Sequence, residues 1–153
     1  MTIQTYLTNV CQHSGIDPEQ LQIDVSEADN VITAAITVPT EDSGLLIGFH
    51  GETLSALQRL TRVVFQADLA DKRLVINVNN YREQRADKLR EIAFRAAQRV
   101  LETGRPYTFS YLPANERFLI HSALNDEESF SSLESVSEGE GMQRVLTIRL
   151  KAE

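Results

Sequence analysis

The sequence predicts an α+β protein made of two small domains in tandem. The chain has 153 residues, a length that suits two small domains or one medium one. Its apolar residues recur with helical spacing in some segments and alternate as in strands in others. The pattern changes at Asn79-Asn80. We therefore expect a first domain over residues 1–80 and a second over residues 81–153.

The first domain is expected to follow the order α-β-β-α-α-β. Ile3 to Gln12 has apolar residues at helical spacing, and Leu21 to Ser26 alternates as a half-buried strand does. After a polar turn, the β-branched run from Val31 to Val38 should pair with that strand as a hairpin. A short apolar helix then ends at Gly48, a helix with one apolar face follows, and Leu74 to Val78 alternates as a third strand.

The second domain should begin with the longest helix of the chain, from Tyr81 to Thr103. Tyr107 to Tyr111 then alternates as a strand, and Asn115 is expected to cap a short helix. Phe130 to Ser137 and Val145 to Leu150 have the pattern of two strands joined by a glycine-rich turn. The expected order is a long helix, a strand, a short helix and a β-hairpin.

Charge is distributed unevenly along the chain. The net charge of −7 would oppose nucleic-acid binding if it were spread evenly over the surface. However, residues 82–105 contain seven Lys/Arg and four Asp/Glu, whereas residues 126–140 contain six Asp/Glu and no base. Screening limits the reach of a charge to about 8–10 Å. A local positive surface can therefore bind phosphates although the whole chain is acidic.

Several classes of protein and site are not expected. No apolar run approaches the roughly 20 residues that cross a bilayer, and the N-terminus lacks the pattern of a secretory signal. We therefore expect a cytoplasmic protein without membrane insertion. The single cysteine, Cys11, excludes an intrachain disulfide and should be a buried small hydrophobe.

Catalysis, a metal and a cofactor are not expected either. The three histidines are scattered without metal-ligand spacing, and the glycine-containing loop after the second helix lacks the Lys-Ser/Thr of a P-loop.

That loop, Gly48-Phe49-His50-Gly51, joins two helical segments. Two glycines let a backbone turn tightly and approach a ligand closely. Free N–H groups at the start of the next helix, where Thr53 lies, would then face a phosphate. This is the physics of the GxxG loop that grips about four nucleotides in KH domains.

The stretch from Leu46 to Leu57 resembles the central segment of the type II KH domain, the bacterial form of this fold. The resemblance implies nucleic-acid binding by Gly48, Phe49, His50, Gly51 and Thr53. The two middle positions of the loop are often basic in that family, whereas here they are Phe49 and His50. In this chain Phe49 would stack on a base and His50 would donate a hydrogen bond.

Arg117 and His121 form a second candidate site. Their i, i+4 spacing places both side chains on one face of a short helix. The run from Asn115 to His121, followed by Asn125-Asp126, resembles the signature of the R-three-H (Arg-x-x-x-His) domain, which binds single-stranded nucleic acid. The resemblance implies that Arg117 meets a phosphate, and that His121 hydrogen-bonds a phosphate or base or braces Arg117.

Further basic residues could extend this positive surface. The candidate auxiliary phosphate contacts are Arg85, Lys88, Arg95, Arg99 and Arg144, with Arg149 as an additional one. The four on the long helix suit a solvated helix face equally well.

A type II KH domain followed by an R-three-H domain resembles one bacterial family, Jag, the SpoIIIJ-associated proteins. The resemblance covers Ile3 to Leu150. It implies a cytoplasmic protein that binds single-stranded RNA, acts in post-transcriptional regulation linked to cell elongation or division, and has a small KH-domain protein as partner. Many members carry a further N-terminal domain and linker; because this chain begins almost at the KH domain, we expect that part to be absent.

Two alternatives stay open at this point. Single-stranded DNA is an alternative ligand. A protein-interaction adaptor with a degenerate RNA-binding surface is an alternative function, because the chain is acidic and its GxxG loop is uncharged. Phosphate contacts make affinity fall steeply with salt, whereas a protein interface responds weakly, so salt dependence distinguishes the two functions.

Overall fold

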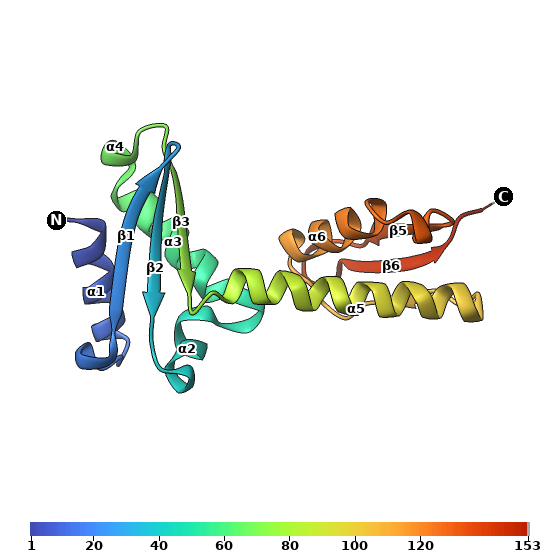
Figure 1. Ribbon diagram of the computed structural model, residues 1–153, viewed down its shortest axis with the longest axis horizontal. Helices are drawn as coiled ribbons and strands as arrows, with labels where there is room; N and C mark the ends of the chain where they lie inside the picture. Colours follow the sequence, from blue (N-terminus) through green and yellow to red (C-terminus); the bar gives the residue numbers. More distant parts are fainter. Residues whose placement is uncertain (153) are drawn as a thin grey trace. The chain divides into compact units, whose positions relative to one another are not determined.

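A computed structural model describes residues 1–152 of the chain. It confirms the α+β class and the two small domains. The chain divides into two compact units, the first from Met1 to Arg82 and the second from Glu83 onward (Figure 1). The division lies in the first turn of helix α5 (Tyr81–Thr103), two residues after the boundary drawn from the sequence. Each unit has its own hydrophobic core.

The first unit follows the predicted order of helices and strands. Its elements are α1 (Ile3–His13), β1 (Gln22–Ala28), β2 (Val31–Thr37), α2 (Thr40–Ile47), α3 (Glu52–Val64), α4 (Gln66–Leu69) and β3 (Arg73–Val78), with 3-10 turns at Pro18–Gln20 and Phe49–Gly51. β1 and β2 are antiparallel and β3 is parallel to β2, which lies in the centre. At the hairpin turn Asp29 and Asn30 have φ of 50° and 64°, as two-residue hairpin loops require.

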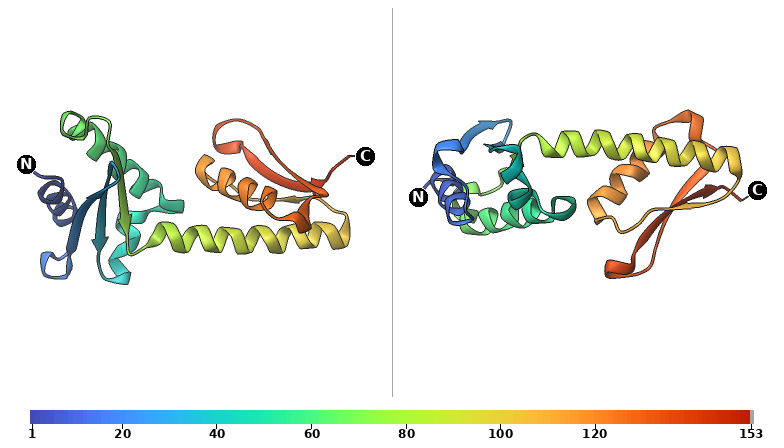
Figure 2. Two further views of the ribbon diagram at one scale, coloured as in Figure 1. Left: turned by 45° about the horizontal axis from the view of Figure 1, so that its top comes forward. Right: turned by 90° about the horizontal axis from the view of Figure 1, so that it is seen from below.

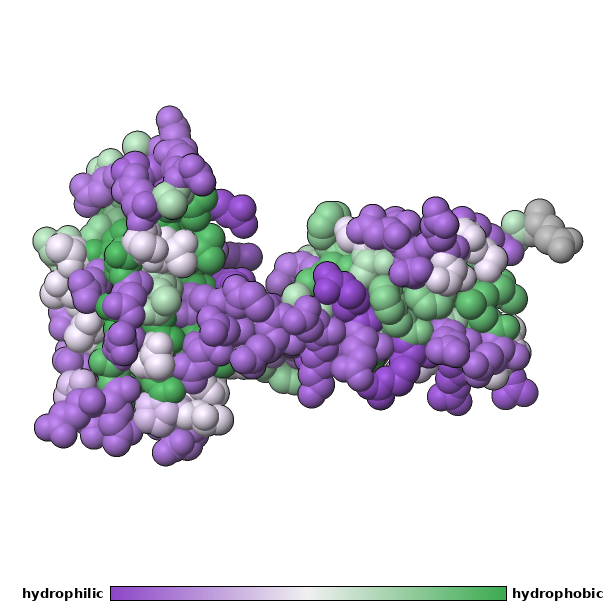
Figure 3. Space-filling view, in the orientation of Figure 1, coloured by the Kyte–Doolittle hydropathy of each residue, from purple (hydrophilic) through white to green (hydrophobic). Residues whose placement is uncertain are grey.

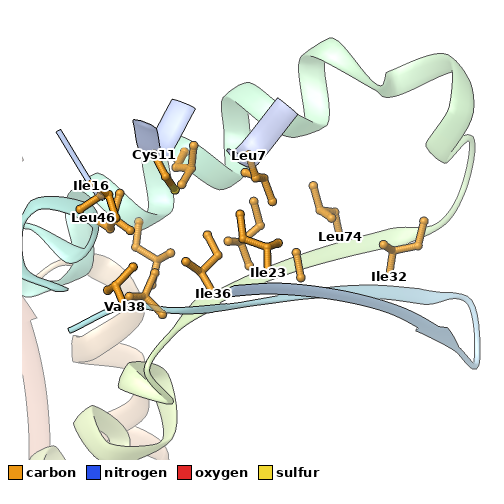
Figure 4. Close-up of a cluster of buried hydrophobic side chains, with 14 of the residues drawn as sticks. Leu7, Cys11, Ile16, Ile23, Ile32, Ile36, Val38, Leu46 and Leu74 are labelled. Atoms are coloured by element: carbon orange, nitrogen blue, oxygen red, sulfur yellow. The ribbon is translucent and has the colours of Figure 1, made fainter. Parts of the chain in front are cut away.

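Helices α1 and α3 cover one face of this sheet (Figure 4). Alternate residues of β2 and β3 point to that face. The register places Ile32 opposite Leu74 and Ile36 opposite Val78, so that buried side chains form rows across the two strands. Leu7 of α1 is fully buried against them. The strand register and the apolar stripe of each helix therefore produce one continuous core.

The second unit also follows the predicted order. After α5 come β4 (Tyr107–Thr108), α6 (Ala114–Asn125), β5 (Leu133–Glu138) and β6 (Val145–Leu150), with 3-10 turns at Glu128–Phe130 and Gly141–Gln143. The sheet is antiparallel with the order β4-β6-β5. Ala93 and Ala97 of α5 and Ile120 of α6 share a buried cluster with Leu146 and Ile148 of β6. Figure 2 shows the two helices and the sheet of this unit from two further sides. Both helices therefore pack on the same face of the sheet.

The predicted cap of α6 is wrong. Asn115 lies inside the helix, and Pro113 occupies the N-cap position without a side-chain hydrogen bond. The Pro113 carbonyl oxygen accepts hydrogen bonds from the N–H groups of Glu116 and Arg117. Proline suits this position because its fixed φ matches an extended entry to the helix and because it has no N–H group that needs a partner.

Two predicted strands are shorter than expected. The N–H of Phe109 still donates to the Leu146 carbonyl oxygen, but only Tyr107–Thr108 forms a strand with β6. Phe130 belongs to a 3-10 turn instead of a strand, and its ring packs on Phe94 of α5 at a centroid distance of 5.3 Å. Phe109 is buried and Phe130 is half-buried, and both lie outside the strands of the sheet.

Most polar residues of α5 face solvent, and Figure 3 shows hydrophilic residues gathered along its visible side. Within residues 1–152, none of the helices has the length and the apolar content that spanning a bilayer would require.

Cys11 is fully buried in the first core, as the sequence predicts. Burial raises the pKa of the Cys11 thiol to about 11. The reactive thiolate is therefore scarce in the folded protein at pH 8. We expect a thiol reagent such as iodoacetamide to leave the native protein unmodified at pH 8 and to modify it completely in urea, as measured by intact mass. Rapid stoichiometric labelling of the native protein would show that this core is not closed.

Candidate nucleic-acid interface

The glycine loop is built around an unusual backbone at Gly48. Its φ of 72° and ψ of −174° lie in a region that only glycine occupies without strain. A Cβ atom at this position would lie 2.1 Å from Thr53 Oγ1 and 2.9 Å from the Thr53 nitrogen. Residue 48 must therefore be glycine both for its conformation and for its close contact with the first turn of α3.

The amides of this loop are mostly used within the chain. The N–H of Gly48 donates to the Gly44 carbonyl oxygen at 2.9 Å, and the N–H of Gly51 donates to the Gly48 carbonyl oxygen at 3.3 Å. The N–H of Glu52 donates to the Phe49 carbonyl oxygen. The expectation of free N–H groups after Gly48 is therefore wrong for Gly51 and Glu52, because the loop closes its own 3-10 turn.

The side chains of the loop are more accessible than its amides. Phe49 is 66% exposed and Thr53 is also exposed, whereas His50 is half-buried. The rings of Phe49 and His50 meet edge to face with centroids 4.1 Å apart. Gly51 is buried, and a Cβ atom there would lie 2.9 Å from Cε1 of Tyr81. The loop thus presents an aromatic ring and a hydroxyl on a backbone that is closed by its own hydrogen bonds.

The second candidate site is a cleft of about 310 Å³ between α6 and the β5–β6 hairpin. Ser135 and Ser137 lie opposite Ile148 and Leu146 in the strand register, so these serines point to the helix-covered face of the sheet. On the α6 side, the residues that face these serines are spaced i, i+3, i+4 and i+7, starting at Ala114. The residues that line the cleft are Ala114, Arg117, Phe118, His121, Ser135, Ser137, Arg144 and Leu146.

Arg117 and His121 lie in this cleft together, as their spacing predicts. Nη1 of the half-buried Arg117 donates to the Leu112 carbonyl oxygen at 2.6 Å, which anchors one side of the guanidinium group. The Asn125 amide is hydrogen-bonded to Nε2 of His121 at 3.1 Å, and Nδ1 of His121 is hydrogen-bonded to the Ser135 hydroxyl. His121 therefore ties α6 to β5, and it is not hydrogen-bonded to Arg117.

Arg144 brings a second guanidinium group to the same cleft. It lies just before β6, and its Nε donates to the Ser137 hydroxyl at 2.9 Å. Arginine has five N–H donors, so one hydrogen bond to the protein leaves donors for a ligand. Of the auxiliary residues that the sequence suggested, Arg144 alone lines the cleft.

Arg85 has a role different from the predicted phosphate contact. Its Nε and Nη2 donate to the two carboxylate oxygens of Glu116 at 2.8 and 3.0 Å. Glu116 is buried, at 3% exposure, and the pair joins α5 to α6. The charge of Arg85 is compensated inside the protein, so it supports the cleft instead of lining it.

The remaining auxiliary residues lie outside the cleft. Arg95 pairs with Glu91 on the solvent face of α5, and Lys88 is exposed on the same helix. Arg99 lines a separate hollow of about 510 Å³ at the end of α5. Arg149 pairs with Glu134 at 2.7 Å on the other face of the sheet.

Phe118 is the one lining residue with a large exposed apolar surface to which the sequence assigned no role. It is 71% exposed and belongs to the stripe of α6 that faces the hairpin. In the sequence Phe118 begins the run Phe-Leu-Ile, which suits a helix core equally well. In the sequence, only its position beside Arg117 could have indicated that Phe118 belongs to the site. The structure was needed to show which apolar residues of α6 are buried and which are exposed.

Comparison with known proteins agrees with the two resemblances. The sequence model of the KH domain of KhpA/KhpB matches residues 3–78, and that of the R-three-H domain matches residues 87–150. The chain is 31% identical over 147 residues to the RNA-binding protein KhpB of Lactiplantibacillus plantarum, which covers 95% of this chain and 43% of that protein. It is 31% identical over 129 residues to the RNA-binding protein KhpB of Bacillus subtilis, covering 84% of this chain and 62% of that protein. The chain thus spans about half the length of these relatives.

Gly48→Ala should destabilise the first unit by about 2 kcal/mol or more, because the new methyl group adds backbone strain and a steric clash with Thr53. Gly44→Ala is the matched control. Gly44 lies within α2, and a methyl group added there would have no neighbouring atom within 4 Å, so the substitution should stabilise by about 0.5–1 kcal/mol. Urea unfolding followed by circular dichroism measures both. Equal stabilities would contradict the role of Gly48.

Glu116→Ala should lower the free energy of unfolding of the second unit by about 3 kcal/mol, because it removes the carboxylate that compensates the half-buried Arg85. Glu134→Ala removes a carboxylate from the more exposed pair with Arg149 and should cost less than about 1 kcal/mol. Thermal unfolding of the two variants makes the comparison. Losses of the same size would mean that burial of the Arg85–Glu116 pair contributes little.

Proposed function

The chain belongs to the KhpB (Jag) family, with a KhpA/KhpB-type KH domain followed by an R-three-H domain, and on this premise we propose that it binds single-stranded RNA. The observation that carries the proposal is the cleft between α6 and the β5–β6 hairpin. Two guanidinium groups, those of Arg117 and Arg144, line it together with His121 and two serine hydroxyls. Arginine is suited to phosphate because its planar group donates several hydrogen bonds and keeps its charge.

The orientation of the two arginines supports phosphate binding. Each is held by one hydrogen bond to the protein, Arg117 by the Leu112 carbonyl oxygen and Arg144 by the Ser137 hydroxyl. Neither of these two partners is a carboxylate, so they do not neutralise the positive charge of either guanidinium group. Anchored guanidinium groups lose less side-chain entropy on binding than free ones do. In this proposal His121 positions Ser135 and the hairpin, and the arginines contact the phosphates.

The loop from Gly48 to Gly51 is the second proposed contact. Its side chains carry no fixed charge, so its contribution is stacking on Phe49 and hydrogen bonding by Thr53 and His50. Gly48 and Gly51 shape the turn that presents these groups. We expect this loop to add affinity that depends little on salt, whereas the cleft supplies the salt-dependent part.

The family resemblance extends the proposal beyond binding. We propose a cytoplasmic protein without catalytic activity that acts in post-transcriptional regulation linked to cell elongation or division. A small KH-domain protein is its proposed partner. RNA is favoured over single-stranded DNA because the relatives are named RNA-binding proteins.

Arg117→Ala should weaken binding to a single-stranded oligoribonucleotide and flatten the plot of log affinity against log salt by about 0.7–1 unit, because one phosphate contact is lost. Arg144→Ala should act in the same way. Fluorescence anisotropy with a labelled oligonucleotide at several salt concentrations measures both slopes.

Arg149→Ala is the control, because it removes the same charge from the opposite face of the sheet and should leave the slope unchanged. If the native protein binds no oligonucleotide at low salt, RNA binding is refuted. If it binds with an affinity that salt does not change, the cleft is not a phosphate site and the protein-interaction adaptor is favoured.

A further inference from the structure

Phe118 is an aromatic side chain exposed at a basic cleft. It is 71% exposed, and among residues 1–152 its ring stacks on no other ring. The neighbouring apolar residues of α6 behave differently, since Ile120 and Leu124 are buried in the core. A phenylalanine ring in contact with water is unfavourably hydrated, and an exposed ring gains little of the free energy that burial in the core would provide. Its position in a cleft with two guanidinium groups suggests a ligand that has both a flat apolar face and negative charge.

We propose that Phe118 stacks on one unpaired base of a bound strand while Arg117 and Arg144 contact the phosphates beside that base. This inference rests on the proposed RNA binding and deepens it. A base in a duplex already stacks on both neighbours, and only an unpaired base has a free face for an aromatic ring. Arg117 and Phe118 are adjacent on α6, so one nucleotide can reach both.

The rest of the cleft gives few contacts that could distinguish one base from another. The Ser135 hydroxyl is hydrogen-bonded to His121, and the Ser137 hydroxyl accepts a hydrogen bond from Arg144, so each serine keeps only part of its hydrogen-bonding capacity for a base. Ala114 and Leu146 have no polar side-chain atoms. Recognition by stacking tolerates any base because every base has a π face. The cleft should therefore discriminate strongly against duplexes and weakly among sequences.

Stacking is tested by two changes made separately and together, one that removes the bases from the ligand and one that removes the ring of Phe118. The ligands are an oligouridine strand about ten nucleotides long, within the usual site size of such proteins, and an abasic strand of equal length and charge. The native protein should bind the abasic strand at least about five-fold more weakly. Phe118→Ala should reduce this difference, leaving only the part that stacking on Phe49 contributes, and Phe118→Tyr should restore it. Phe118→Ala should leave the salt slope unchanged, in contrast to Arg117→Ala.

A spectroscopic test follows from the absence of tryptophan in the chain. Phe118→Trp places a single reporter at the cleft, and a base stacked on the indole should quench its fluorescence. Leu101→Trp, at a 40% exposed position on α5, is the matched control and should not respond. A duplex of the same length should quench Phe118→Trp much less than the single strand does.

The possible failures are distinguishable. If the native protein binds both strands equally, with a steep salt slope that Arg117→Ala flattens, the stacking role of Phe118 is overturned and RNA binding stands. If duplex and single strand quench the reporter alike, the selectivity is overturned. If no strand binds at low salt, the proposed function itself fails, and the exposed Phe118 belongs to a protein interface.

Discussion

The second unit depends on the buried pair between Arg85 of α5 and Glu116 of α6. A carboxylate that is only 3% exposed is stable there because two N–H groups of one guanidinium meet its two oxygens. The pair fixes the rotation of α6 about its own axis. Because successive helical residues are turned by about 100°, a Glu116 that points inward directs Arg117 and Phe118 away from the core. The pair therefore helps to set which residues of α6 line the cleft.

The uneven charge of the chain has a structural explanation. Most arginines with a described partner are neutralised by a carboxylate, as Arg95 is by Glu91 and Arg149 is by Glu134. Arg117 and Arg144 are held instead by a carbonyl oxygen and a hydroxyl. A neutral partner fixes the geometry of a guanidinium group and leaves its charge in place. An acidic protein can in this way keep a small region that attracts phosphate.

The two candidate sites use different chemistry. The cleft combines positive charge with an exposed aromatic ring, whereas the Gly48–Gly51 loop has an exposed aromatic ring without a fixed charge. The glycines of the loop also have a different role from the one expected. Gly48 accommodates Thr53, and the amides that follow it close the 3-10 turn of the loop, so that the glycines shape the loop more than they expose its backbone.

The sequence by itself determined the order of elements, the register of apolar residues and the two motifs. These features are local, since helical spacing, strand alternation and turn residues act over a few neighbours. The helix from Tyr81 to Thr103 and the shared face of Arg117 and His121 follow from this spacing alone. Only the tertiary structure decided which charges are neutralised and which apolar residues of α6 are exposed. Arg85 and Arg144 look alike in the sequence, but one meets a carboxylate 31 positions away and the other a serine hydroxyl across a hairpin. Such partners are set by packing between distant segments, which no local pattern encodes.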